Sequence, residues 1–201
     1  MRVAVLASGE GTNLQALLDR VNGRDGIAVV AVASDRPAAR ALERARSAGV
    51  VAAVFEREQY GDRASRDRAM AAWLAEQGAE LIVLAGYMEL LSPEFLRRFA
   101  GRVINVHPAL LPAFPGLRAV QQALDYGVKV FGVTVHFVDE GIDTGPVILQ
   151  RAVELDAQRV EEVMERLQPV EHELLPEAVR LIASGAVRVD EANPRRVVIE
   201  R

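Results

Sequence analysis

Short apolar runs alternate with longer amphipathic stretches along most of this chain. The runs with the length and the β-branched content of buried strands lie at 3–7, 27–33, 50–55, 81–85 and 103–107. Between them, segments such as Leu14 to Val21 repeat apolar residues at helical spacing. Strands that alternate with helices in repeats of about 30 residues predict a mainly parallel sheet covered by helices on both faces.

Helix starts and stops agree with this alternation. Ser34 or Asp35 can cap a helix that runs from residue 37 to 48, and Ser92-Pro93 places a capping serine before a proline at the first helical position. Glycines end several of the expected helices, because glycine adopts the left-handed conformation of a helix terminus. The helices expected in this way span 14–21, 37–48, 62–77, 118–126 and a short segment from residue 92.

The second half departs from strict alternation. Strands at 128–137 and 147–153 follow one another across an acidic loop, which predicts a mixed sheet. Residues 159–184 are expected to be largely helical, with a break or kink at Pro169 and Pro176, and 187–189 and 197–199 to form a terminal hairpin. We predict an α/β fold with a mostly parallel, Rossmann-like doubly wound sheet. It forms a single domain, with a phosphate-binding half (1–100) and a catalytic half (101–201).

Composition narrows the class of protein. The 201 residues contain no cysteine, which excludes disulfides and thiolate metal sites, and only three histidines, which gives no metal cluster. The net charge of −4 does not suggest binding to nucleic acid, and no apolar run reaches the roughly 20 residues of a membrane helix. The N-terminus enters a strand without a secretory signal pattern. A soluble, cytoplasmic, globular protein is expected.

Asn105 and His107 form the first candidate site, because they stand two residues apart at the end of the strand at 103–107. Side chains at this spacing leave a strand on the same face, and ligands of parallel α/β sheets collect at carboxyl ends of strands. An amide donor beside an imidazole suits a reaction that forms an oxyanion and moves a proton. The alternative is a strand terminus whose polar groups bind loop backbone.

Gly9-x-Gly11-Thr12-Asn13 lies between the first strand and the first helix. Glycines let backbone amides approach an anion, and the helix N-terminus adds a partial positive charge. The loop lacks the Gly-Lys-Ser/Thr of a nucleotide-binding P-loop and the third glycine of a dinucleotide fingerprint. A phosphate monoester therefore fits best, although a capped helix after a tight turn would look similar.

Two further segments carry candidate residues. The acidic loop at 139–146 places Asp143 where it could face His107, and a carboxylate beside an imidazole favours its charged form. Otherwise this loop is a solvated hairpin. The segment 86–91 follows a strand and carries Met88, Leu90 and Leu91, which either line a pocket for a flat heteroaromatic ring or pack under the next helix. His136, inside an apolar strand, is interpreted as a structural histidine near the site.

Together these segments resemble the phosphoribosylglycinamide formyltransferase family, the folate-dependent enzymes of purine synthesis. The resemblance covers Val3 to about Pro176. It rests on Ser8-Gly-Glu-Gly-Thr-Asn-Leu14, Leu84-Ala-Gly-Tyr-Met88, Asn105-Val-His-Pro-Ala-Leu-Leu-Pro112, and Gly132 to Val138 followed by Asp143-x-Gly-Pro-Val-Ile-Leu-Gln150. The Asn-x-His-Pro segment with its downstream aspartate is shared by the wider formyltransferase group, whereas the N-terminal loop points to the glycinamide ribonucleotide member.

The resemblance implies transfer of a formyl group from 10-formyltetrahydrofolate to the amine of phosphoribosylglycinamide, without a metal. It implies Asn105, His107 and Asp143 as catalytic residues. The implied substrate-binding residues are Gly11, Thr12, Asn13, Gln168, Pro169, Val170 and Glu171. The folate would contact Asn105 and Asp143 together with Arg63, Met88, Glu89, Leu90, Leu91, Asp139, Glu140, Gly141 and Ile142. Monomeric and homodimeric states both remain open.

Two positions differ from the family's usual pattern. Leu117-Arg118-Ala119 follows Pro115-Gly116 where the family commonly has histidines, and position 89 is Glu where a basic residue is usual. Three other functions remain possible on the residues alone. They are formyl transfer to an amino sugar nucleotide, a folate- or nucleotide-binding module without turnover, and a nicotinamide oxidoreductase.

Overall fold

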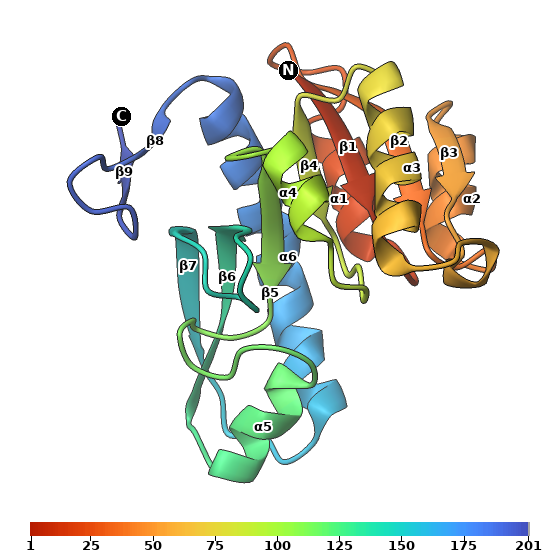
Figure 1. Cartoon of the computed structure of the whole chain (residues 1–201). Helices are drawn as coiled ribbons and strands as arrows, with labels where there is room; N and C mark the ends of the chain where they lie inside the picture. Colours follow the sequence, from red (N-terminus) through yellow and green to blue (C-terminus); the bar gives the residue numbers. More distant parts are fainter. Residues whose placement is uncertain (201) are drawn as a thin grey trace. The chain divides into compact units, whose positions relative to one another are not determined.

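The computed structural model describes residues 1–200, and the chain divides into two compact units, Met1–Ile104 and Asn105–Arg201 (Figure 1). Each unit is described by itself below. The prediction of a single domain concerns how the two units fold together, and it stays a prediction.

The N-terminal unit is built on four parallel strands in the order β3-β2-β1-β4. These strands are β1 (Arg2–Leu6), β2 (Ala28–Ser34), β3 (Val51–Val54) and β4 (Leu81–Leu84). Most of β1, β2 and β4 is buried, as expected for strands covered on both faces. The parallel part of the predicted sheet is confirmed.

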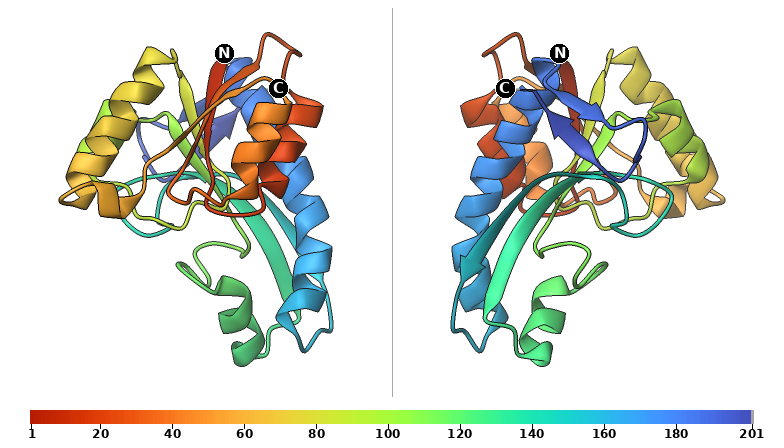
Figure 2. Two further views of the ribbon diagram at one scale, coloured as in Figure 1. Left: turned by 90° about the vertical axis from the view of Figure 1, so that its right-hand side faces the viewer. Right: turned by 90° about the vertical axis from the view of Figure 1, so that its left-hand side faces the viewer.

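Helices cover both faces of this sheet. Helices α1 (Thr12–Arg20) and α2 (Arg40–Ser47) lie on one face, and α3 (Arg63–Glu76) and α4 (Pro93–Arg98) lie on the other (Figure 2). A short 3₁₀ helix, η1, spans Arg57–Gln59. The predicted cap at Ser92 is confirmed, because its hydroxyl accepts a hydrogen bond from the Phe95 amide. Asp62 caps α3 as well, by accepting a hydrogen bond from the Ser65 amide, and the sequence analysis did not predict this cap. Helix α2 begins at Arg40, three residues later than the sequence predicts, and the predicted cap at Ser34 or Asp35 is wrong. The N-cap is Ala39, without a side-chain hydrogen bond, because Ser34 ends β2 and its hydroxyl accepts from the Arg36 amide instead.

The C-terminal unit combines an antiparallel pair with a long helix. Strand β5 (Val103–His107) begins at the boundary of the two units, and β6 (Val130–Phe137) pairs antiparallel with β7 (Val147–Glu154). Helix α6 (Val160–Ala183) packs against β6 and β7, and α5 (Ala119–Tyr126) packs against α6. The predicted terminal hairpin is confirmed as β8 (Val187–Val189) and β9 (Val197–Ile199).

Helix α6 is a single helix that continues through Pro169 and Pro176, so the predicted alternative of a break is wrong, and a kink stays a prediction. A proline inside a helix removes one backbone hydrogen bond and costs about 3 kcal/mol or more. Residues on both sides of the prolines are fully buried, among them Leu167 and Leu175. Burying each such side chain contributes about 1.5–3 kcal/mol, so packing along the whole helix outweighs the local preference to break.

Candidate active site

Asn105 and His107 leave the end of β5 in the C-terminal unit. The His107 side chain is almost fully buried, and Asn105 is half-buried. Both side chains contact the same residue, Asp143, so they emerge toward one place as the spacing of two residues predicts.

Asp143 is the centre of this cluster. Its Oδ2 atom accepts a hydrogen bond of 2.8 Å from the Gly116 amide and lies 3.3 Å from His107 Nδ1. Its Oδ1 atom accepts a hydrogen bond of 3.2 Å from Asn105 Nδ2 and lies 3.4 Å from His136 Nε2. The structure therefore brings together the three side chains that the sequence suggested as catalytic. Their catalytic role itself stays a prediction.

His107 lies between two oxygen acceptors. Its Nε2 atom lies 2.9 Å from the carbonyl oxygen of Phe114, and its Nδ1 atom faces the Asp143 carboxylate. Both partners are acceptors, so either ring nitrogen finds an acceptor when it carries a proton. The imidazole thus connects the turn after β5 with the Asp143 carboxylate.

His136 has a different environment. Its Nδ1 atom donates to the Phe137 carbonyl at 2.8 Å, while Nε2 lies between a donor, Asn105 Nδ2 at 3.3 Å, and an acceptor, Asp143 Oδ1 at 3.4 Å. This nitrogen has a partner whether or not it carries a proton. Sequence reasoning placed His136 near the site only as a structural residue.

The ionisation of Asp143 is set by these neighbours. Burial raises the pKa of the carboxyl, but hydrogen bonds from His136 and the Gly116 amide and the charges of His107 and His136 outweigh it, and the pKa falls to about 2. The carboxylate therefore keeps its negative charge well below neutral pH and can act as the counterion of His107.

The lowered pKa predicts a pH dependence of stability. Because folding lowers the pKa of Asp143 from 3.8 to about 2, the ionised carboxylate stabilises the folded state by about 2 kcal/mol at neutral pH. That contribution is complete above about pH 5 and is lost as the pH falls from about 4 to about 2. The difference in free energy of unfolding between wild type and Asp143→Asn, measured with urea, should shrink over this range.

Asp125 provides a matched control for this measurement. It lies on the exposed surface of α5 and pairs only with the Gln121 side chain among the contacts of its carboxylate in residues 1–200. The difference in free energy of unfolding between wild type and Asp125→Asn should change little over the same pH range. A difference for Asp143→Asn that is independent of pH would contradict the inferred ionisation.

Residues Phe114, Arg118 and Asp143 have left-handed backbone conformations, with φ of 53°, 57° and 52°. Non-glycine residues adopt this region at a cost, and such positions collect at functional sites. All three belong to the loops that approach His107 and its counterion. The loop after β5 and the acidic loop are therefore held in specific conformations around this cluster.

Thr134 and Gln150 fix the turn that follows β5, and sequence reasoning missed both. The Thr134 hydroxyl donates to the Ala109 carbonyl at 2.7 Å and accepts from the Leu111 amide at 3.1 Å. Gln150 Nε2 donates to the Leu111 carbonyl at 2.8 Å and to Thr134 at 2.9 Å. A signal was present in the alternation of β6, because Thr134 stands two residues before His136 and so shares its face.

In the acidic loop, the side chain of Asp139 forms hydrogen bonds with two other residues of the loop. Its carboxylate accepts hydrogen bonds from the Gly141 amide at 3.1 Å and the Thr144 hydroxyl at 2.6 Å. Ile142 projects into solvent with 54% of its surface exposed. The loop is thus an ordered turn with an exposed apolar tip, and contact of residues 139–142 with a folate stays a prediction.

The glycine loop lies in the N-terminal unit and leads into α1. Gly11 is the N-cap, with a left-handed φ of 70°, and Thr12 and Asn13 form the first turn. The segment is held by α2: the Ala41 amide donates to the Gly9 carbonyl at 3.1 Å, and Arg44 Nε donates to the Glu10 carbonyl at 2.8 Å. Binding of a phosphate at this helix N-terminus stays a prediction.

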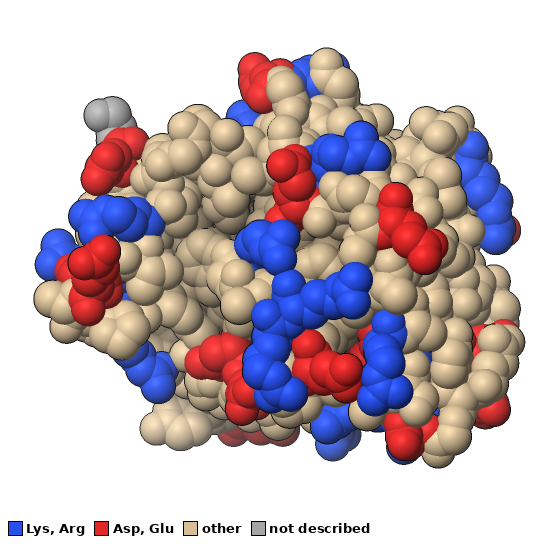
Figure 3. Space-filling view, turned by 45° about the horizontal axis from the view of Figure 1, so that its top comes forward, with Lys and Arg blue, Asp and Glu red and all other residues tan. Residues whose placement is uncertain are grey.

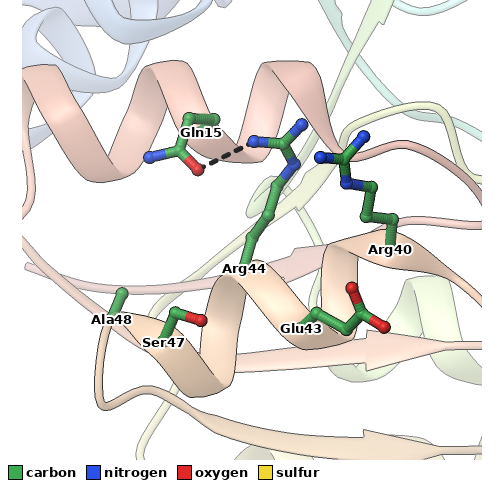
Figure 4. A pocket seen from close by; sticks show the side chains of 6 residues that line it. All are labelled: Gln15, Arg40, Glu43, Arg44, Ser47 and Ala48. Atoms are coloured by element: carbon green, nitrogen blue, oxygen red, sulfur yellow. Dashed lines mark hydrogen bonds between the residues drawn. The ribbon is translucent and has the colours of Figure 1, made fainter.

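A hollow of about 370 Å³ lies between α1 and α2, lined by Gln15, Arg40, Glu43, Arg44, Ser47 and Ala48 (Figure 4). Arg44 spans it and donates to the Gln15 side chain at 3.0 Å. Arg40 forms an ion pair with Glu10 at 3.3 Å. The residues that line the hollow thus fasten α2 to α1 and to the glycine loop, and none of them belongs to the predicted substrate-binding set.

The predicted folate residues of the N-terminal unit differ in exposure. Met88 and Leu90 are exposed at 54% and 55%, whereas Leu91 is buried. Glu89 pairs with Arg66 of α3. Arg63 lies exposed at the start of α3. Two apolar side chains are therefore available to a ligand, as one of the two interpretations of this segment predicts.

The last predicted substrate residues lie on α6 in the C-terminal unit. Gln168 and Pro169 are exposed, Val170 is partly exposed, and Glu171 is 5% exposed. The resemblance implies that Glu171 holds the ribose of the nucleotide substrate. The contact with a ribose stays a prediction.

Charges of both signs are mixed on the molecular face of Figure 3, where basic and acidic side chains stand next to each other. Within residues 1–200, no group of three or more His, Asp or Glu side chains is arranged to hold a metal ion. Over the same residues, no helix is long and apolar enough to cross a membrane.

Comparison with known proteins defines the class. The model of the formyl transferase family matches residues 1–179, which include the glycine loop, the strand end at Asn105 and His107, and Asp143. The chain is thus a formyl transferase by family, and the resemblance seen in its motifs is confirmed.

Individual relatives narrow the class further. Phosphoribosylglycinamide formyltransferase of Bacillus subtilis is 41% identical over 89% of this chain and 93% of its own length. The crystal structure of glycinamide ribonucleotide transformylase 1 from Symbiobacterium toebii matches 100% of this chain and 94% of that chain, with a TM-score of 0.95 and 48% identity. The chain belongs to the phosphoribosylglycinamide formyltransferase family, and the predicted fold class is confirmed.

Larger proteins contain a similar segment. The bovine trifunctional purine biosynthetic protein adenosine-3 is 44% identical over 94% of this chain. This chain spans only 19% of the length of that relative. The similarity is therefore to one part of the trifunctional protein.

Proposed function

We propose that this protein transfers the formyl group of 10-formyltetrahydrofolate to the amine of phosphoribosylglycinamide, giving phosphoribosyl-N-formylglycinamide and tetrahydrofolate. The observation that carries the proposal is the convergence of Asn105, His107 and His136 on the carboxylate of Asp143 at the end of β5. Family membership and the position of the glycine loop at the N-terminus of α1 support it.

The reaction begins when the amine of the acceptor attacks the formyl carbon. A C–N bond forms, and the carbonyl oxygen gains negative charge in a tetrahedral intermediate. His107 and Asn105 are the donors that stabilise this oxygen, and one such donor typically contributes about 3–4 kcal/mol. To act, the Nε2–H of His107 turns from the Phe114 carbonyl to the substrate oxygen, and one N–H of Asn105 Nδ2 turns to it from Asp143 or His136.

Collapse of the intermediate breaks the bond between the formyl carbon and N10 of the folate. The attacking amine loses a proton and N10 gains one, so the charges balance without a metal. Asp143 holds the cationic form of His107, which supplies the proton to the leaving nitrogen. His136, which has partners in both protonation states, accepts a proton on the route from the amine.

The substrates are assigned to different parts of the chain. The phosphate of the acceptor binds at the start of α1 through Gly11, Thr12 and Asn13, since the amides of a helix N-terminus bind anions. Its ribose hydroxyls bind Glu171 in the segment 168–171. The folate contacts Arg63, the segment 88–91 and the loop 139–143. The protein is proposed to work in the cytoplasm on small molecules, as a monomer or a homodimer.

The test is a direct assay of the purified protein. We expect tetrahydrofolate to form, followed by absorbance, when 10-formyltetrahydrofolate and phosphoribosylglycinamide are both present, and formation to stop when the nucleotide is omitted. Loss of the formyl group without nucleotide would indicate a hydrolase. Transfer only to an amino sugar nucleotide would show that the proposed acceptor is wrong. Binding of both ligands without reaction would indicate a binding module and not an enzyme.

A further inference from the structure

Arg66 and Asp67 of α3 are charged residues whose side chains are completely buried in the N-terminal unit. Removing an ion from water costs several kcal/mol, which is recovered only through close pairing and hydrogen bonds. The partners of the pair show which part of the chain it connects to α3.

The partners of the pair all lie in one segment. Arg66 forms an ion pair of 2.9 Å with Glu89, and its guanidinium also reaches the Leu90 carbonyl at 3.4 Å. Asp67 Oδ1 accepts two hydrogen bonds from Arg66, at 2.8 and 3.0 Å, and Oδ2 accepts one of 2.5 Å from the Ser92 amide. The buried pair thus binds three residues of the segment 86–92.

The other end of this segment is held by the glycine loop. The Ser8 amide donates to the Gly86 carbonyl at 3.0 Å, and the Met88 amide donates to the Ser8 hydroxyl at 2.8 Å. Residues 86–92 are therefore fastened at both ends. Between the attachments, Met88 and Leu90 hold their apolar side chains in solvent.

Exposed apolar side chains on a backbone fixed by buried charges are arranged to meet a ligand. Fixing the segment before binding lowers the conformational entropy that a ligand would otherwise have to remove. A flat heteroaromatic ring buries apolar surface against such side chains without demanding a charged partner. The carboxylate of Glu89 faces Arg66, and 29% of the Glu89 side chain is exposed. Its charge therefore pairs with Arg66 and attaches the segment 86–92 to α3.

We propose that Arg66 and Asp67 are positioning residues, and that Glu89 is the latch through which they hold residues 86–92 ready for the ring of the formyl donor. The proposal rests on the proposed function, since it takes the folate as the ligand of Met88 and Leu90. In this proposal, Glu89 fixes the segment 86–92 through its ion pair with the buried Arg66.

Glu89→Ala tests the latch, and Glu94→Ala is its matched control. Glu94 also pairs with an arginine of α3, Arg68 at 3.2 Å, but both side chains are at least half exposed and lie outside the segment. Glu89→Ala leaves Arg66 paired with Asp67, so the protein should stay folded. Glu89→Gln keeps an acceptor for Arg66 and should rescue most of the effect.

Two measurements on the full chain give the answer. In calorimetry with tetrahydrofolate as the probe, we expect Kd to rise about tenfold in Glu89→Ala and less than about twofold in Glu94→Ala. In hydrogen exchange without ligand, the backbone amides of residues 86–92 should exchange at least about fivefold faster in Glu89→Ala than in wild type. In Glu94→Ala their exchange should match wild type. The KM for the nucleotide should not change.

Each contrary result has a separate meaning. Unchanged exchange in Glu89→Ala, or an equal loss of tetrahydrofolate affinity in Glu94→Ala, would overturn the positioning role. Failure of the wild-type protein to bind tetrahydrofolate would overturn the proposed donor instead. The exchange measurement needs no folate, so it would still decide whether Glu89 holds the segment.

Discussion

Replacing His107 by alanine is expected to lower turnover by about 10³-fold or more, because one side chain supplies both an oxyanion donor and the proton for the leaving nitrogen. The two contributions come from the same imidazolium, which lies between the Phe114 carbonyl and the Asp143 carboxylate. The measurement is single-turnover formation of tetrahydrofolate at saturating concentrations of both substrates.

Binding of the nucleotide separates a chemical effect from a folding effect. The phosphate is proposed to bind at Gly11 to Asn13, in the N-terminal unit, and not at His107. We therefore expect the Kd of the nucleotide in His107→Ala to stay within about threefold of wild type, a change of less than 1 kcal/mol. Asp125→Asn, on the surface of α5, should keep full turnover. Turnover of His107→Ala within tenfold of wild type would remove His107 from the mechanism.

Gly11→Ala should cause the largest loss of nucleotide affinity. Gly11 has a φ of 70°, which costs an alanine about 1–2 kcal/mol. An added Cβ would also lie 2.8 Å from Cα and Cβ of Ala41 in α2, so the helix would have to move, at a further cost of about 1–3 kcal/mol. The start of α1 and the proposed phosphate site would shift together.

The expected result is a fall in Tm of several degrees and a rise of about tenfold or more in the KM of the nucleotide. Thermal unfolding and steady-state kinetics measure the two effects. Gly9→Ala is the matched control in the same loop, because a Cβ at that position meets no atom within 4 Å. Its Tm should equal that of wild type. Equal Tm values for Gly11→Ala and Gly9→Ala would show that close packing against Ala41 does not govern this loop.

The structure shows the surroundings of Glu89 and of the segment 117–119, which differ from the usual family pattern. Glu89 is paired with the buried Arg66, so a basic residue there would lose this partner. Leu117 is 70% exposed, and Arg118 has a left-handed φ of 57°. The described cluster around Asp143 contains two histidines, His107 and His136, which supply imidazole groups without any contribution from the segment 117–119.

Local patterns in the sequence were sufficient for most of the fold. Apolar runs and glycine or serine helix ends located the strands and helices, because a strand repeats every two residues and a helix about every 3.6. The same periodicity placed Asn105 and His107 on one face of β5, and it was able to place Thr134 with His136. The glycine loop was recognised because its chemistry lies within one turn of chain.

Only the tertiary structure decided which distant groups meet. Asp143 is 36 residues from His107 along the chain, and its contacts with Asn105, His107, His136 and Gly116 depend on how two loops and two strands pack. The continuity of α6 through Pro169 and Pro176 depends on its packing against β6 and β7. The burial of Arg66 against residues 86–92 could not be predicted from the sequence either, since a charged residue on an amphipathic helix is expected to face solvent. Periodicity determines which way a side chain points, and packing determines what it meets there.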